Sequence, residues 1–146
     1  MVPVGEWSFE SVDRSGEFVT NAGDFATLGP VSAFSAERVR QQATFTVVGG
    51  LADVRCVTFR AADGRYLRHS ELRLRFSVDD HTALFREDAT FCPRPGAATG
   101  SVVLQSHNYP ALVLRHRDGG SWLAVPDGTV AFARQSSFVT HTPWVS

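Results

Sequence analysis

The sequence has 146 residues, 43% of them hydrophobic, and its formal net charge is −1. This length is enough for one domain with a buried core, while the near-neutral charge excludes the basic field with which proteins gather nucleic acid or anionic membranes. No apolar run approaches the roughly 18 residues of a membrane-spanning helix, so we expect a soluble domain with neither nucleic acid nor membrane as partner.

Two short segments recur three times along the chain. GEFVTN at 16–21 is followed by RQQATF ending at Phe45, and GRYLRH at 64–69 by REDATF ending at Phe91. ALVLRH at 111–116 is followed by ARQSSF ending at Phe138. The spacing is even, since 91−45 = 46 and 138−91 = 47. Self-similarity at such a period predicts a fold built from three copies of one unit.

The middle unit shows how each copy folds. Apolar residues alternate with polar ones at Val57 and Phe59, and again at Leu72, Leu74 and Phe76, with Gly, Asp and Ser between the runs. Alternation of this kind predicts short strands joined by turns. Because no apolar period of 3.6 residues persists along the chain, we expect helices to be few and short.

Three units with about four strands each predict an all-β fold with threefold pseudo-symmetry, a β-trefoil. We place the repeats at about 1–50, 51–98 and 99–146 within a single domain covering 1–146. The repeated Phe and Leu positions would fill the shared axis, because one unit could not bury its apolar face alone. A three-bladed propeller is the weaker alternative, since propellers usually have at least four blades.

The chain has two cysteines, Cys56 and Cys92. Two cysteines cannot form a zinc site alone, so they are either free thiols or one disulfide. We favour the disulfide, which would indicate an oxidising compartment. The residues after Met1, VPVGEW, lack the basic start and apolar stretch of a secretory signal. Either a signal has been removed, or the protein is not secreted by that route.

The middle and third repeats carry a family resemblance. FRAADGRYLRHSELRLRF and FREDATFCPRPG in the middle repeat, and LQSHNYPALVLRHRDGGSWLA in the third, resemble the AbfB domain, carbohydrate-binding module family 42. This module accompanies many arabinofuranosidases. The resemblance implies a β-trefoil without catalytic activity or cofactor that binds polysaccharides bearing arabinofuranosyl side chains, such as arabinoxylan or arabinan. It also implies an extracellular location and a Cys56–Cys92 disulfide, and we expect a monomer.

The same resemblance implies where sugar binds. A pocket of this family uses a His from the RH segment and an Asp from the DATF segment of one repeat, and His69 and Asp88 match both. Tyr66 lies close by. The third repeat keeps His116 but has Gln135 at the Asp position, which puts its pocket in doubt. The first repeat has other residues at both positions, and we interpret it as structural.

The chemistry of these side chains fits a sugar ligand. The Asp88 carboxylate can accept hydrogen bonds from neighbouring hydroxyls, and His69 can donate to a sugar oxygen. Tyr66 can offer a ring face and a hydroxyl. The structural alternatives are a turn aspartate that caps its own backbone, a histidine oriented by a backbone carbonyl, and a core tyrosine.

Two further function classes remain as alternatives. A glycosidase needs two facing carboxylates, but Glu87 and Asp88 are adjacent and would point to opposite faces of a strand. Asp79, Asp80 and His81 could in principle hold a metal, although their spacing matches no metal motif and favours a solvated turn. A degenerate trefoil that has lost sugar binding and serves as a protein-interaction or structural domain is the principal alternative.

Overall fold

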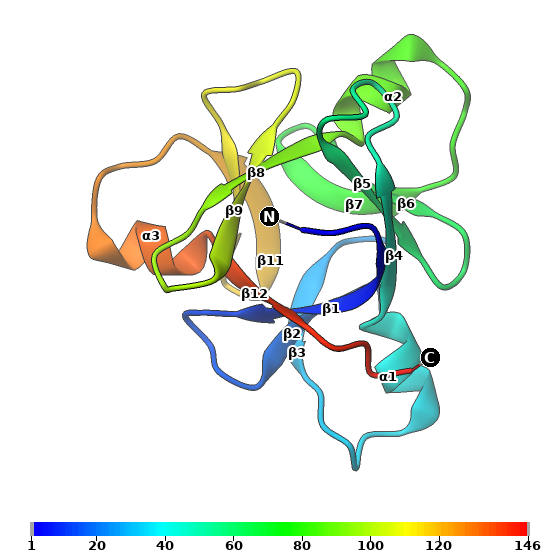
Figure 1. Ribbon diagram of the computed structural model, residues 1–146, viewed down its shortest axis with the longest axis vertical. Coiled ribbons are helices and arrows are strands. Elements are labelled where there is room, and N and C mark those ends of the chain that lie inside the picture. The colour runs from blue at the N-terminus through cyan, green and yellow to red at the C-terminus, as the bar shows by residue number, and fades with distance from the viewer. Residues whose placement is uncertain (1, 146) are drawn as a thin grey trace.

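The computed structural model describes residues 2–145, and within them the chain forms three similar lobes around a common axis (Figure 1). Each lobe holds four strands and one short helix. The first contains β1 (Gly5–Ser11), β2 (Glu17–Thr20), β3 (Thr27–Pro30), α1 (Glu37–Gln42) and β4 (Phe45–Gly49). The second contains β5 (Val57–Ala61), β6 (Tyr66–Ser70), β7 (Arg73–Ser77), α2 (Ala83–Asp88) and β8 (Phe91–Pro95). The third contains β9 (Ser101–Ser106), β10 (Val113–Arg117), β11 (Gly120–Ala124), α3 (Val130–Gln135) and β12 (Ser137–His141).

The first and last strands of the three lobes close into an antiparallel barrel. Around the ring β1 pairs with β4, β4 with β5, β5 with β8, β8 with β9, β9 with β12, and β12 returns to β1. Closure leaves this ring without a free sheet edge. The remaining strands form the hairpins β2–β3, β6–β7 and β10–β11, which meet through the pairs Gly120↔Thr27 and Trp122↔Arg73 and the bridge Phe25↔Arg75. Barrel and hairpin cap together are the predicted β-trefoil.

The core lies on the pseudo-threefold axis. All three lobes contribute buried apolar side chains, among them Phe9, Phe45, Phe59, Phe91 and Phe138. Val19, Leu67 and Leu114 hold matching places on β2, β6 and β10 and line one apolar cavity of about 20 Å³ at the centre. The removal of these apolar side chains from water drives folding. A single lobe could not bury its apolar face alone.

The helices are six residues long, as the missing 3.6-residue period predicts. Thr82 caps α2 and Thr129 caps α3 by accepting hydrogen bonds from the backbone N–H three residues on, at 3.1 Å in both. Buried Phe85 and Phe132 then anchor the helices against β6 and β10 of the hairpins. No helix within residues 2–145 is long and apolar enough to cross a membrane.

The expectation that Glu87 and Asp88 lie on a strand is wrong, because they are the last two residues of α2. The Thr82 cap and the buried Phe85 hold this segment as a helix, and the strand begins only at Phe91. Their side chains still diverge: Glu87 contacts His107, whereas Asp88 contacts Arg68.

The disulfide between Cys56 and Cys92 is confirmed, with their Cα atoms 4.6 Å apart. Cys56 immediately precedes β5 and Cys92 lies on β8. These two strands share the single register pair Val57↔Phe91. The disulfide therefore reinforces a junction of the middle lobe that has only one register pair.

Candidate functional site

Asp88 is the centre of a polar set in the middle lobe. It ends α2 and is buried, yet its carboxylate is paired. Arg68 on β6 donates from Nη2 to Oδ2 at 2.6 Å, and His69 Nε2 lies 3.3 Å from Oδ1. A buried carboxylate is tolerated only when paired and hydrogen-bonded in this way. A carboxylate has about four acceptor positions, so these contacts leave capacity for ligand hydroxyls.

Asn108, which follows β9 in the third lobe, completes the set. Its Nδ2 donates to Asp88 Oδ1 at 2.9 Å, and its Oδ1 lies 2.8 Å from His69 Nε2. Because an ionised carboxylate only accepts, the amide nitrogen must face Asp88 and the amide oxygen must face His69. His69 therefore carries its proton on Nε2. Ser106 Oγ also donates to this amide oxygen, at 3.1 Å, which fixes the orientation of Asn108.

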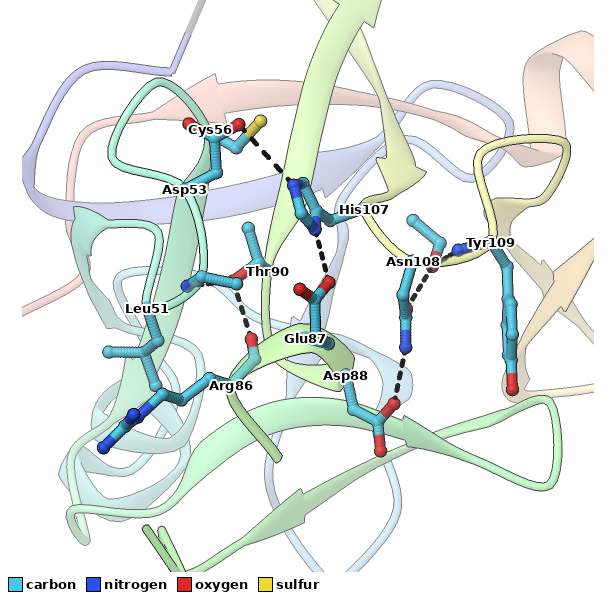
Figure 2. A network of polar contacts seen from close by, with 12 residues as sticks. Leu51, Asp53, Cys56, Arg86, Glu87, Asp88, Thr90, His107, Asn108 and Tyr109 are labelled. Carbon is cyan, nitrogen blue, oxygen red and sulfur yellow. Dashed lines mark hydrogen bonds and ion pairs between the residues drawn. The ribbon is translucent and has the colours of Figure 1, made fainter. Parts of the chain in front are cut away.

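A second layer of contacts positions the loop that carries Asn108 (Figure 2). His107 lies between two carboxylates, with Nδ1 2.6 Å from Glu87 and Nε2 3.5 Å from Asp53. Hydrogen bonds from Arg55, foremost from its side chain, hold the pKa of Asp53 at about 2, so this carboxyl stays ionised. The His107 backbone N–H also donates to Thr90 O at 3.1 Å. The loop of the third lobe is thus docked on α2 of the middle lobe.

A pocket of about 350 Å³ opens over this polar set. Its polar floor contains Arg68, His69 and Asp88, and apolar walls come from Leu72, Leu84 and Tyr109. Tyr109 is half exposed, and its ring centroid lies 4.9 Å from that of His69. Figure 2 shows Tyr109 next to Asn108 on the same loop. An aromatic face beside converging polar groups suits a small ligand with one apolar and one hydroxylated side.

Tyr66 lies elsewhere. It begins β6, and its ring packs edge to face against Phe85 with centroids 6.3 Å apart. It is not among the residues that line the pocket, where Tyr109 is the aromatic side chain. The structure thus brings His69 and Asp88 together and places Tyr66 against the anchor of α2.

In the third lobe His116 and Gln135 contact different partners. His116 lies on β10, is buried, and has Nε2 2.9 Å from Asp13 Oδ2. Gln135 ends α3 and accepts a hydrogen bond from Arg115 Nη2. Asp13 comes from the loop between β1 and β2 of the first lobe.

Among residues 2–145, the first lobe forms no such set. Asn21 and Gln42 occupy the positions that correspond to His69 and Asp88. They are joined by a backbone hydrogen bond, in which Asn21 N donates to Gln42 O at 3.0 Å. The loop between β5 and β6 corresponds to the loops that carry Asn108 and Asp13, but it is shorter than both. Its Asp63 pairs with Arg65. The structural interpretation of this repeat fits these contacts.

The acidic segment before α2 is a capping turn. Asp79 accepts from His81 N at 2.7 Å, and Asp80 accepts from Thr82 N and Oγ1. These hydrogen bonds, first the one from the Thr82 hydroxyl, lower the pKa of Asp80. No group of three or more His, Cys, Asp or Glu within residues 2–145 is arranged to hold a metal ion.

Sequence reasoning missed Arg68, Asn108 and Tyr109. Asn108 and Tyr109 come from the neighbouring lobe, whereas the predicted pair, His69 and Asp88, lies within one repeat. The available signal was the NYP turn at 108–110, whose position just before a recurring strand places it at a junction between lobes.

Known proteins match this chain over most or all of its length, both in sequence and in structure. A family model described as the alpha-L-arabinofuranosidase B (ABFB) domain matches residues 7–140. Alpha-L-arabinofuranosidase B of Emericella nidulans is 34% identical over 97% of this chain and 30% of its own length. A crystal structure of an arabinofuranosidase complexed with arabinofuranosyl-alpha-1,2-xylobiose superposes with a TM-score of 0.93 at 26% identity, covering all of this chain and 32% of that one. The chain thus spans about a third of the length of these relatives. SeviL, solved with the asialo-GM1 saccharide, shares only the fold, with a TM-score of 0.70 at 7% identity.

Proposed function

Because the chain belongs to the alpha-L-arabinofuranosidase B (AbfB) domain family, we propose that it is a noncatalytic module that binds arabinofuranose side chains of polysaccharides such as arabinoxylan or arabinan. One observation carries the proposal: the buried Asp88, held by Arg68, His69 and Asn108, forms the floor of an open pocket. The solved relative with an arabinofuranosyl-xylobiose supports the ligand class.

The pocket explains how a neutral sugar would be held. Free acceptor positions on Asp88 would take hydrogen bonds from sugar hydroxyls, and charge-assisted bonds of this kind are the stronger ones. Tyr109 would pack its ring against the C–H face of the sugar. A small neutral sugar has few non-hydrogen atoms, and each contributes at most about 1.5 kcal/mol of binding free energy. We therefore expect weak binding at each site, and an affinity for the polymer that rises with the density of its arabinofuranosyl side chains.

The module would act next to a glycoside hydrolase. The family model takes its name from an arabinofuranosidase, and the chain matches about a third of the length of such an enzyme. Within the described residues, Glu87 is engaged by His107 and Asp88 by Arg68, so these adjacent carboxylates do not face each other across the pocket. The Cys56–Cys92 disulfide supports an oxidising, extracellular setting.

Affinity electrophoresis tests the proposal. We expect the protein to migrate more slowly in native gels containing arabinoxylan or branched arabinan than in gels containing unsubstituted xylan. No arabinose should be released from either polymer. Equal mobility in all gels would contradict the proposal and support the alternative of a trefoil that has lost sugar binding. Release of arabinose would contradict the noncatalytic assignment.

A further inference from the structure

The polar sets of the middle and third lobes contain the same four kinds of group in a different order. In the middle lobe the helix supplies the carboxylate, Asp88, and the loop of the next lobe supplies the amide, Asn108. In the third lobe the helix supplies the amide, Gln135, and the loop of the next lobe supplies the carboxylate, Asp13. The third repeat has no carboxylate at this position of its own helix, and Asp13 supplies one across the junction with the first lobe.

Two contacts around this exchange correspond to contacts of the middle lobe. Arg115 lies on β10 as Arg68 lies on β6, and each donates to the side chain that ends the following helix. His116 is buried, and its Nε2 is 2.9 Å from Asp13, as His69 Nε2 is 2.8 Å from Asn108. Because a carboxylate only accepts, His116 also carries its proton on Nε2.

Asp13 keeps acceptor capacity for a ligand. Its Oδ2 contacts His116, and its Oδ1 has Arg134 Nε at 3.9 Å, an ion-pair distance beyond that of a hydrogen bond. The Asp13 side chain is 29% exposed, against 7% for Asp88, so a ligand can reach it. Arg134 also donates to Val12 O at 3.2 Å, which links α3 to the loop that carries Asp13.

We propose that Asp13 is the carboxylate of a second sugar pocket, formed between the third and first lobes with Arg115, His116 and Gln135. This inference rests on the proposed function and takes the same ligand class, an arabinofuranosyl group. Arg14 follows Asp13 where Tyr109 follows Asn108, so this pocket lacks the aromatic wall. We therefore expect it to bind more weakly than the middle pocket.

Site-resolved NMR titration of the whole chain with methyl α-L-arabinofuranoside tests the inference. Backbone amides near His69 and near His116 should shift along two separate binding curves. Asp13→Asn should weaken the curve at His116 about ten- to a hundredfold, the effect of removing a hydrogen bond to a charged group, and change the curve at His69 less than twofold. Asp118→Asn, on the exposed β10–β11 turn, is the matched control and should change neither curve.

A rescue variant separates binding from folding. Asp13→Asn combined with Gln135→Asp rebuilds the order of the middle lobe and should restore the shifts near His116. Shifts near His116 that survive Asp13→Asn, their absence in the parent protein, or failure of the rescue variant would overturn the inference. Absence of shifts near His69 would instead contradict the proposed function, so the two failures are distinguishable.

Discussion

Asp88→Ala is expected to weaken sugar binding at the middle pocket about ten- to a hundredfold. The change removes hydrogen bonds to a charged group, each worth about 1.5 to 3 kcal/mol, and leaves the Arg68 guanidinium without its carboxylate. Titration of a labelled sample with an arabinofuranosyl oligosaccharide, followed at the amides near His69, measures the effect. Asp88→Asn keeps the shape of the side chain without its charge and should also weaken sugar binding at the middle pocket.

Two matched variants make this result specific. Asp63→Ala removes an exposed acid of the same lobe and should bind like the parent. Gln135→Ala lies in the third lobe and should leave the curve near His69 unchanged. Circular dichroism should show that each variant retains the β-rich spectrum. Parental affinity of Asp88→Ala at the middle pocket would show that this carboxylate does not contact the sugar.

Removal of the disulfide is expected to lower the free energy of unfolding by up to about 4 kcal/mol. The bridge closes a loop over a sequence separation of 36, and on the chain-entropy model a loop of this size restricts the unfolded chain by about that amount. The effect should be large here because β5 and β8 share only one register pair. Urea unfolding of the oxidised parent and of a Cys56→Ser, Cys92→Ser double variant measures the difference.

A thiol titration provides the control for this comparison. The unfolded, unreduced parent should show no free thiol. Two free thiols, or equal urea midpoints for the parent and the double variant, would contradict a stabilising bridge.

The fold follows from features that a sequence displays directly. The nearly equal spacing of Phe45, Phe91 and Phe138 predicted the three units, and each of these residues is the first or second residue of the last strand of its lobe. A core shared by the three units could be inferred because one unit cannot bury its own apolar face. The Asp88 helix was not predicted, since six residues are too few for a helical apolar period to appear.

The candidate site was predicted only as far as it lies within one repeat. His69 and Asp88 belong to the same lobe, and the family resemblance pairs them. Asn108 and Asp13 reach their pockets from the following lobe, and Asp13 does so across 103 positions in the chain. Contacts of this kind arise from the pseudo-threefold arrangement, so they become visible only once the lobes are placed around the axis.

A crystal structure of the chain soaked with methyl α-L-arabinofuranoside tests the central claim most directly. We expect the sugar in the middle pocket, with its hydroxyls within hydrogen-bond distance of Asp88 and its C–H face against Tyr109. A sugar bound only outside the pockets that contain Asp88 and Asp13, or no bound sugar in crystals where both pockets are open to solvent, would contradict the assignment of this chain as an arabinofuranose-binding module.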